Sequence, residues 1–303
     1  MVSVNTIFVS LPSMSLLARS IANTLGRKLI VPEIIHFSDG EMEIMLTDTA
    51  IFKGKHVCIV HSTNMPVHET LVELLLLVNE LCNAGAVSIT ALIAYFGYTR
   101  HDSSKITGGQ ASIALMAKLL NAAGINNIIT VEIHNPEIAS SLVLPVHSIS
   151  LAPFIAEHIK RTLPSLVGVC LVAPDQGAMG RVQEIARILG VESISFTKER
   201  YAADKTKLVS SQGSFIGTTA IIIDDIIDTG GTAINACEQL YKNGYTTIYG
   251  YFVHPVLSGG AQERITESSF TRVFVSNTIP LSICVPKIKI FDIAQVISEV
   301  LST

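Results

Sequence analysis

The chain has 303 residues, enough for about two ordinary domains that bury a large core without the help of disulfides. It is 49% hydrophobic and 15% charged, yet no run of about 18 uninterrupted apolar residues occurs, so we expect no membrane-spanning helix. Its 21 Lys+Arg and 25 Asp+Glu residues give a net charge of -4, so the basic surplus that nucleic-acid binding requires is missing.

Cysteine usage and the start of the chain both favour a cytoplasmic protein. The five cysteines are odd in number, far apart and free of C-x-x-C spacing, so we expect buried free thiols rather than disulfides or structural zinc. No basic n-region precedes the first apolar residues, which argues against a secretory signal peptide. The sparse charge indicates that surface is hidden in subunit contacts, so we expect a homo-oligomer.

Apolar runs of strand length alternate with helix-period segments along nearly the whole chain. This alternation is typical of an α/β fold with mainly parallel sheets flanked by helices. The predicted strands lie at residues 55–60, 89–96, 127–133, 167–173, 219–224, 246–253 and 272–278. The helix after the strand at 219–224 is predicted to bury one face, made of Ala233, Cys237, Leu240 and Tyr241.

A weak internal similarity connects residues 80–96 with residues 239–255, because both read as a helix end, a glycine and a strand. Any two helix–glycine–strand junctions look alike, so the similarity leaves a chance resemblance open. If it is real, the chain holds two similar α/β domains, which we place at residues 1–146 and 147–303. The last helix, at about residues 290–302, could pack back on the first domain.

The most informative segment is the stretch TAIIIDDIIDTGGTAIN, residues 219–235. A buried strand delivers Asp224 and Asp225 to the edge where open α/β sheets place ligands. Asp228 then precedes residues 229–232, Thr-Gly-Gly-Thr, where glycines, N–H groups and a helix N-terminus can cradle a phosphate. Neither the P-loop nor the G-x-G-x-x-G pattern fits. The paired carboxylates suit the hydroxyls of a polyol and can help to hold magnesium.

The segment at 219–235 resembles the ribose-phosphate loop of type I phosphoribosyltransferases, and further motifs narrow the match. In order along nearly the full chain, they resemble the ribose-phosphate diphosphokinase (PRPP synthetase) family. These motifs lie at residues 37–44, 59–78, 94–102, 131–138, 172–178, 195–200, 257–265 and 275–281. The resemblance implies two tandem phosphoribosyltransferase-like domains. It also implies transfer of the diphosphoryl group of MgATP to the 1-hydroxyl of ribose 5-phosphate, giving phosphoribosyl diphosphate (PRPP) and AMP.

The resemblance implies a role for each residue that matches one of the family's motifs. The ribose 5-phosphate positions are Arg200, Asp224, Asp225, Asp228, Thr229, Gly230, Gly231 and Thr232. The ATP positions, on the first domain, are Phe37, Asp39, Gly40, Glu41, Arg100 and His101. The catalytic cations are Lys198 and Arg200, which we expect in a polar loop at residues 198–207. The Mg²⁺ positions are His134 and Asp175.

The resemblance also implies an assembly, with a dimer as the minimum and a hexamer as the larger form, because residues 37–41 reach a neighbouring subunit's ATP site in the family. Two other readings stay open. A catalytically silent relative that regulates active synthetases is favoured by the altered stretch at 101–104, His-Asp-Ser-Ser, where the family has Gln-Asp-Arg or a close variant. A phosphoribosyltransferase that consumes PRPP would share the Thr-Gly-Gly-Thr loop but would not require residues 37–41.

Overall fold

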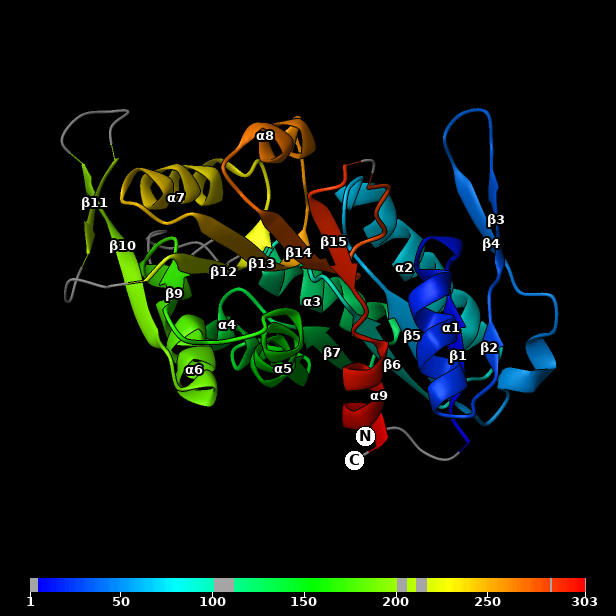
Figure 1. Cartoon of the computed structure of the whole chain (residues 1–303). Helices are drawn as coiled ribbons and strands as arrows, with labels where there is room; N and C mark the ends of the chain where they lie inside the picture. The colour runs from blue at the N-terminus through cyan, green and yellow to red at the C-terminus, as the bar shows by residue number, and fades with distance from the viewer. Residues whose placement is uncertain (1–4, 101–111, 201–205, 211–216, 284, 303) are drawn as a thin grey trace. The chain divides into compact units, whose positions relative to one another are not determined.

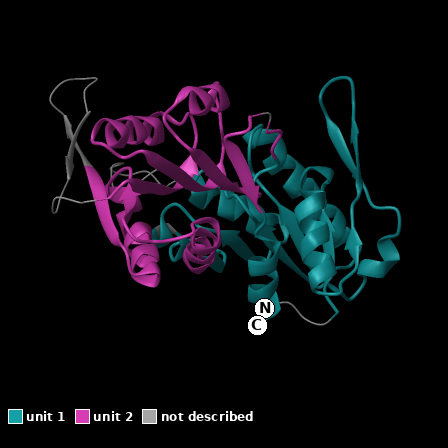
Figure 2. Ribbon diagram, viewed as in Figure 1, with its two compact units in different colours: residues 1–149, 278–280, 292–303 teal, residues 150–277, 281–291 magenta. Residues whose placement is uncertain are grey.

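A computed structural model describes residues 5–100, 112–200, 206–210, 217–283 and 285–302, with the backbone alone at 138, 197–200 and 206–210. The chain forms two compact α/β units (Figures 1 and 2). Unit 1 consists of residues 1–149, 278–280 and 292–303, and unit 2 consists of residues 150–277 and 281–291. In the described part of the chain, no helix is long and apolar enough to cross a membrane.

Unit 1 is built on a parallel sheet with the strand order β2-β1-β5-β6-β7-β8. In that order the strands are Leu29–Ile30, Ile7–Ser10, His56–His61, Ser88–Ile93, Asn127–Val131 and Val146–Ile149. Its helices are η1 Pro12–Met14, α1 Ser15–Thr24, η2 Thr49–Phe52, α2 Val67–Asn83, α3 Ser112–Ala123, α4 Pro136–Ala139 and α9 Ala294–Ser302. A separate antiparallel hairpin, β3 Glu33–His36 and β4 Met42–Met45, projects from this unit (Figure 1).

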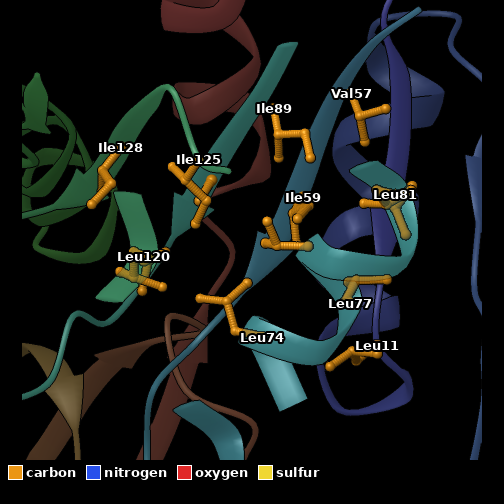
Figure 3. Packing of buried hydrophobic residues seen from close by; sticks show 14 of the residues in the cluster. Leu11, Val57, Ile59, Leu74, Leu77, Leu81, Ile89, Leu120, Ile125 and Ile128 are labelled. Atoms are coloured by element: carbon orange, nitrogen blue, oxygen red, sulfur yellow. The ribbon is translucent and has the colours of Figure 1, made fainter. Parts of the chain in front are cut away.

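The core of unit 1 forms where α2 and α3 pack on one face of this sheet. Leu74, Leu77 and Leu81 recur at helical spacing on α2 and meet Val57 and Ile59 of β5 (Figure 3). All five are at most 1% exposed, and burial of each such side chain stabilises the fold by about 1.5–3 kcal/mol. On the other side of the unit, α1 packs against α9, so the C-terminal helix belongs to unit 1.

Unit 2 is built on a sheet with the strand order β11-β10-β9-β12-β13-β14-β15. In that order the strands are Thr206–Ser210, Glu192–Arg200, Val169–Ala173, Thr219–Ile227, Thr247–Pro255, Arg272–Ser276 and Ile288–Phe291. All neighbours pair in parallel except β10 and β11, which form an antiparallel hairpin. The helices are α5 Ala152–Thr162, η4 Gln176–Ala178, α6 Met179–Leu189, α7 Gly231–Lys242 and α8 Ala261–Glu267.

The two units share one topology. When β11 is left out, each sheet places its strands in the chain order 2-1-3-4-5-6. Each unit also carries an antiparallel hairpin: β3–β4 follows the second strand of unit 1, and β10–β11 includes the second strand of unit 2. The structure thus confirms the α/β class with mainly parallel sheets and extends the similarity between residues 80–96 and 239–255 to the strand order of both units.

Three local predictions were wrong. The segment at 198–207 is not one loop, because its ends join β10 and β11 through the ladder from Phe196↔Ser210 to Arg200↔Thr206. Tyr241 is 58% exposed, and Ala236 completes the buried face of α7 instead, because it lies between Ala233 and Leu240 on the helix surface. Cys82 is an exposed free thiol, whereas Cys58, Cys170 and Cys237 are buried as expected and Cys284 lies outside the described residues.

Candidate functional site

Two carboxylates lie side by side within β12. This strand runs three residues beyond its predicted end, because its pairing with β13 continues to Ile227↔Pro255. Asp224 and Asp225 therefore lie in extended backbone, with Asp225 only 4% exposed. The backbone N–H of Asp225 donates to Asp224 Oδ1 at 2.9 Å. A buried strand that carries two acids is costly unless a positive charge or a polar ligand compensates them.

Arg181 on α6 supplies part of that compensation. Its Nη1 lies 3.7 Å from Asp225 Oδ1 and 4.0 Å from Asp224 Oδ1. Burial, together with the carboxylates of Asp225 and Asp175, nevertheless raises the pKa of Asp224 well above its usual range. One guanidinium lies beside two carboxylates, so this edge of the sheet favours a hydrogen-bond donor or a cation. The sequence reasoning missed Arg181, whose only signal was its place in the helix after Asp175.

Asp175 follows β9 and caps the short helix η4. Its Oδ1 accepts the backbone N–H of Gly177 at 3.0 Å. Gln176 in the same turn donates from Nε2 to Ser195 Oγ of β10 at 3.1 Å. Because β9 pairs with both β10 and β12, this turn and the acids of β12 share the carboxyl edge of one sheet. The Asp175 carboxylate is one of the groups that raise the pKa of Asp224.

The connection from β12 to α7 has the geometry of an anion-binding turn. Gly230 adopts φ +80° and caps α7, a conformation that an L side chain enters at a cost of about 1–2 kcal/mol. Among the described residues, the N-cap position is a glycine without a side-chain cap and the first turn of α7 carries no acid, so the partial positive charge of the helix N-terminus favours an anion. Thr229, Gly231 and Thr232 are exposed around it.

The segment between β13 and α8, together with α8 itself, holds the β12–α7 connection in place through hydrogen bonds. Ser258 Oγ donates to Asp228 Oδ1 at 2.5 Å, and the backbone N–H of Leu257 donates to the Ile227 carbonyl at 3.1 Å. Arg264 of α8 donates to the Thr229 carbonyl from both Nε and Nη2. The sequence reasoning quoted residues 257–265 as a motif but gave none of them a role, since nothing local shows that they meet residues 227–229.

Lys198 and Arg200 lie two positions apart near the end of β10. The ladder places them opposite Leu208 and Thr206 of β11. Alternation along a strand puts both on the same face of the hairpin. The hairpin extends the sheet edge next to β9 (Figure 1). Their predicted catalytic role stays a prediction.

Four of the predicted ATP residues form the turn of the β3–β4 hairpin in unit 1. The Phe37 N–H donates to the Glu41 carbonyl at 2.8 Å, and the Glu41 N–H donates to Asp39 Oδ1 at 3.0 Å. Gly40 adopts φ +93°, which closes the turn without strain. Phe37 is 48% exposed. An exposed ring on a projecting hairpin is available for stacking on a base.

Left-handed backbone at non-glycine residues marks three strand-to-loop connections. Among the described residues it occurs at Tyr98 (φ 64°), Glu132 (φ 42°) and Leu257 (φ 47°). Tyr98 precedes the predicted ATP residue Arg100 by two positions, and Glu132 precedes the exposed His134 by two. Strained backbone of this kind clusters at functional sites. The remaining ATP residue, His101, lies outside the described residues.

The residues at the carboxyl edge of unit 2 fit a magnesium ion that shares its coordination with a substrate. Among the described residues, no group of three or more His, Cys, Asp and Glu could hold a metal ion. Magnesium usually keeps several waters and binds through one or two carboxylates plus phosphate oxygens. The excess of carboxylate charge over Arg181 near Asp224 is consistent with that arrangement.

Two α/β units of one topology, with a Thr-Gly-Gly-Thr turn that opens a helix after the third sheet strand of the second, define a protein of the phosphoribosyltransferase-like class. The model for the N-terminal domain of ribose phosphate pyrophosphokinase matches residues 6–124. The model for the phosphoribosyl synthetase-associated domain matches residues 187–303.

Similar proteins agree with this class over nearly the whole chain. The ribose-phosphate pyrophosphokinase of Helicobacter hepaticus is 32% identical over 95% of this chain and 92% of its own length. That of Burkholderia pseudomallei is 34% identical over 94% of this chain and 90% of its own length. The crystal structure of phosphoribosylpyrophosphate synthetase from Mycobacterium smegmatis superimposes with a TM-score of 0.88 at 25% identity, covering 98% of both chains. The chain belongs to the ribose-phosphate pyrophosphokinase family, for which diphosphokinase and PRPP synthetase are other names.

Proposed function

We propose that this protein transfers the diphosphoryl group of ATP to the 1-hydroxyl of ribose 5-phosphate, giving PRPP and AMP for nucleotide biosynthesis. The observation that carries the proposal is the carboxyl edge of unit 2, where the uncapped N-terminus of α7 adjoins the paired acids of β12. An anion site beside two carboxylates matches a sugar phosphate, which presents a phosphate and vicinal hydroxyls on one small molecule.

The β12–α7 connection would bind both parts of ribose 5-phosphate. The N–H groups and hydroxyls of residues 229–232 would bind the 5-phosphate. Asp224 and Asp225 would accept hydrogen bonds from the ribose hydroxyls, which would offset the cost of placing the buried Asp225 next to a second acid. Asp228, whose Oδ1 already accepts from Ser258, would be held at the rim of the same site.

Lys198 and Arg200 would act on the group in transfer. The 1-hydroxyl oxygen attacks the β-phosphorus of ATP, and the bond breaks between that phosphorus and the oxygen that it shares with the α-phosphorus. AMP leaves with that oxygen, and the proton of the 1-hydroxyl goes to solvent. Negative charge spreads over the oxygens during this transfer, so fixed cations stabilise the transition state more than the ground state. Arg200 would also contact ribose 5-phosphate.

Mg²⁺ is the predicted cofactor. When bound, it supplies positive charge that neutralises the phosphate oxygens. Asp175 would contact it from the β9–η4 turn, and His134 of unit 1 is the second predicted contact. Magnesium prefers oxygen ligands, so His134 would act through a water molecule.

Unit 1 would carry the nucleotide side. Phe37 would stack on adenine, while Asp39, Gly40, Glu41, Arg100 and His101 would supply directional polar contacts. The exposed β3–β4 turn supports a role for a homo-oligomer, with a dimer as the minimum and a hexamer as the larger form, in which this turn completes a neighbouring ATP site. A cytoplasmic location stays a prediction.

One assay tests the activity. The purified chain is incubated with Mg²⁺, ATP and ribose 5-phosphate, and AMP and PRPP are separated and quantified. We expect the two products in equal amounts, and none when Mg²⁺ is chelated. A failure to form AMP under varied phosphate and nucleotide concentrations would instead favour a regulatory relative without catalysis. PRPP consumption with release of diphosphate would identify a phosphoribosyltransferase.

A further inference from the structure

We propose that Arg264 is a positioning residue that sets the orientation of the β12–α7 turn for the phosphate of ribose 5-phosphate. The proposal deepens the proposed function and rests on it. Arg264 belongs to α8 and is exposed, far along the chain from the turn that it contacts. Its guanidinium donates to backbone carbonyls from all three of its nitrogens.

The guanidinium joins two loops at the same sheet edge. Nε and Nη2 both donate to the Thr229 carbonyl, with Nε at 3.2 Å, while Nη1 donates to the Gly259 carbonyl at 2.7 Å. The planar fork of arginine allows this set of contacts, whereas lysine offers a single ammonium group. Hydrogen bonds from a charged donor are about twice as strong as neutral ones.

The consequence for the turn follows from the planar trans peptide. The carbonyl of Thr229 and the N–H of Gly230 belong to one peptide group and point in opposite directions. Because Arg264 holds the carbonyl toward α8, the Gly230 N–H must point away from α8. A charged donor on the carbonyl also polarises the peptide and strengthens its N–H as a donor. Arg264 thus prepares one N–H of the turn for an anion without touching that anion itself.

Two neighbours of Arg264 hold the same connection. Ser258 donates to Asp228, and Leu257, in left-handed backbone at φ 47°, donates its N–H to the Ile227 carbonyl. Residues 227, 228 and 229 are therefore each held by the segment from Leu257 to Arg264. Such bracing reduces the ordering that the turn must undergo when the phosphate binds.

Calorimetry on the full chain tests the proposal. We would measure the Kd of ribose 5-phosphate, of inorganic phosphate and of ATP for the unaltered protein and for Arg264→Ala, Arg264→Lys and Ser258→Ala. Arg272→Ala serves as the matched control, because Arg272 is an exposed arginine at the start of β14 in the same unit. Thermal unfolding of every variant separates a binding defect from a folding defect.

We expect Arg264→Ala to raise the Kd of ribose 5-phosphate by about tenfold, the low end for loss of charged hydrogen bonds at an exposed site. The Kd of ATP should change less than about twofold, and Arg264→Lys should recover only part of the loss. Arg272→Ala should bind like the unaltered protein.

An unchanged Kd for ribose 5-phosphate in folded Arg264→Ala would overturn the proposal, and so would an equal loss for ribose 5-phosphate and ATP. If Arg264→Ala does not fold, Arg264→Lys decides by the same two criteria. These measurements need no turnover, so their outcome is distinct from the AMP assay, whose failure would reject the proposed activity alone.

Discussion

Each unit places a titratable side chain near the carboxyl end of its third sheet strand, yet the two units use different chemistry there. In unit 1 this residue is His61, at the end of β5 and fully buried. In unit 2 it is Asp224, beside Asp225 on β12. Burial lowers the pKa of His61 to about 4 and raises the pKa of Asp224. The histidine is kept neutral in its own core, while the acids lie at an edge with a free helix end.

The connections that follow these two strands also differ in their side chains. Between β5 and α2, Thr63 is satisfied internally, since its Oγ1 donates to the Tyr95 carbonyl and accepts the Gly97 N–H at 2.7 Å. The first turn of α2 carries the acid Glu69, which offsets the helix dipole. The first turn of α7 carries no acid. One topology therefore carries an internally hydrogen-bonded turn in unit 1 and, in unit 2, a turn that opens a helix without an acid in its first turn; the side chains make the difference.

The largest expected effect belongs to the hairpin of unit 2. Lys198→Ala should lower kcat by about two to three orders of magnitude with a modest change in KM, as expected when a transition-state contact is lost. Lys207→Ala, on the partner strand opposite Glu199, is the matched control and should leave kcat nearly unchanged. Steady-state AMP formation measures both. A change confined to KM would contradict the assigned role.

The pH dependence of stability should separate the two units. The Nε2–H of His61 donates to the Thr70 carbonyl at 2.8 Å, and its pKa of about 4 lies below the usual 6.5. The unfolded chain binds the proton first, so acidification from pH 6.5 to 4 should cost roughly 3 kcal/mol of unit 1 stability. In His61→Gln this loss of stability on acidification should be smaller. Urea unfolding, monitored by hydrogen exchange of the β5 amides, measures it.

Asp224 should act with the opposite sign. Its pKa is raised in the folded state, so its contribution to the stability of unit 2 is fully present at low pH and is lost as the pH rises through that pKa. Asp224→Asn should therefore raise the stability of unit 2 at neutral pH, while the affinity for ribose 5-phosphate falls. Identical pH profiles for His61→Gln, Asp224→Asn and the unaltered protein would refute the contrast between the two strand ends.

A pair of glycines tests the turn itself. Gly230→Ala places an L side chain at φ +80°, with its Cβ 3.2 Å from Ile234 Cδ1. Gly244→Ala, at φ +93°, meets no atom within 4 Å. Both should lose about 1–2 kcal/mol of stability, but only Gly230→Ala should raise the KM for ribose 5-phosphate, by about tenfold. Equal KM values in the two variants would show that the turn does not contact the substrate.

The smallest effect is expected on the exposed side of α7. Tyr241→Ala should change the free energy of unfolding by no more than about 0.5 kcal/mol, since surface substitutions usually stay within that range. Its neighbour Leu240 is 2% exposed, and Leu240→Ala should cost about 2–5 kcal/mol. Thermal unfolding compares the two. A loss above 1 kcal/mol for Tyr241→Ala would support the prediction, made from periodicity alone, that Tyr241 belongs to the buried face.

Much of the fold could be read from local patterns. Continuous apolar runs predicted the buried parallel strands, because both faces of such strands are covered by helices. The strand ends were less accurate, since β12 continues past Asp224 through pairing with β13, a partner remote in sequence. The β10–β11 hairpin was missed for a similar reason: its polar residues pair between two strands, whereas polarity by itself indicates a loop.

The sequence by itself determined the α/β class, the Thr-Gly-Gly-Thr turn and the neighbouring acids, because strand period, glycine spacing and charge are local properties. Only the tertiary structure decided what surrounds that turn. Arg181 and Arg264 come from helices that follow other strands, and the parallel sheet brings their loops to one edge.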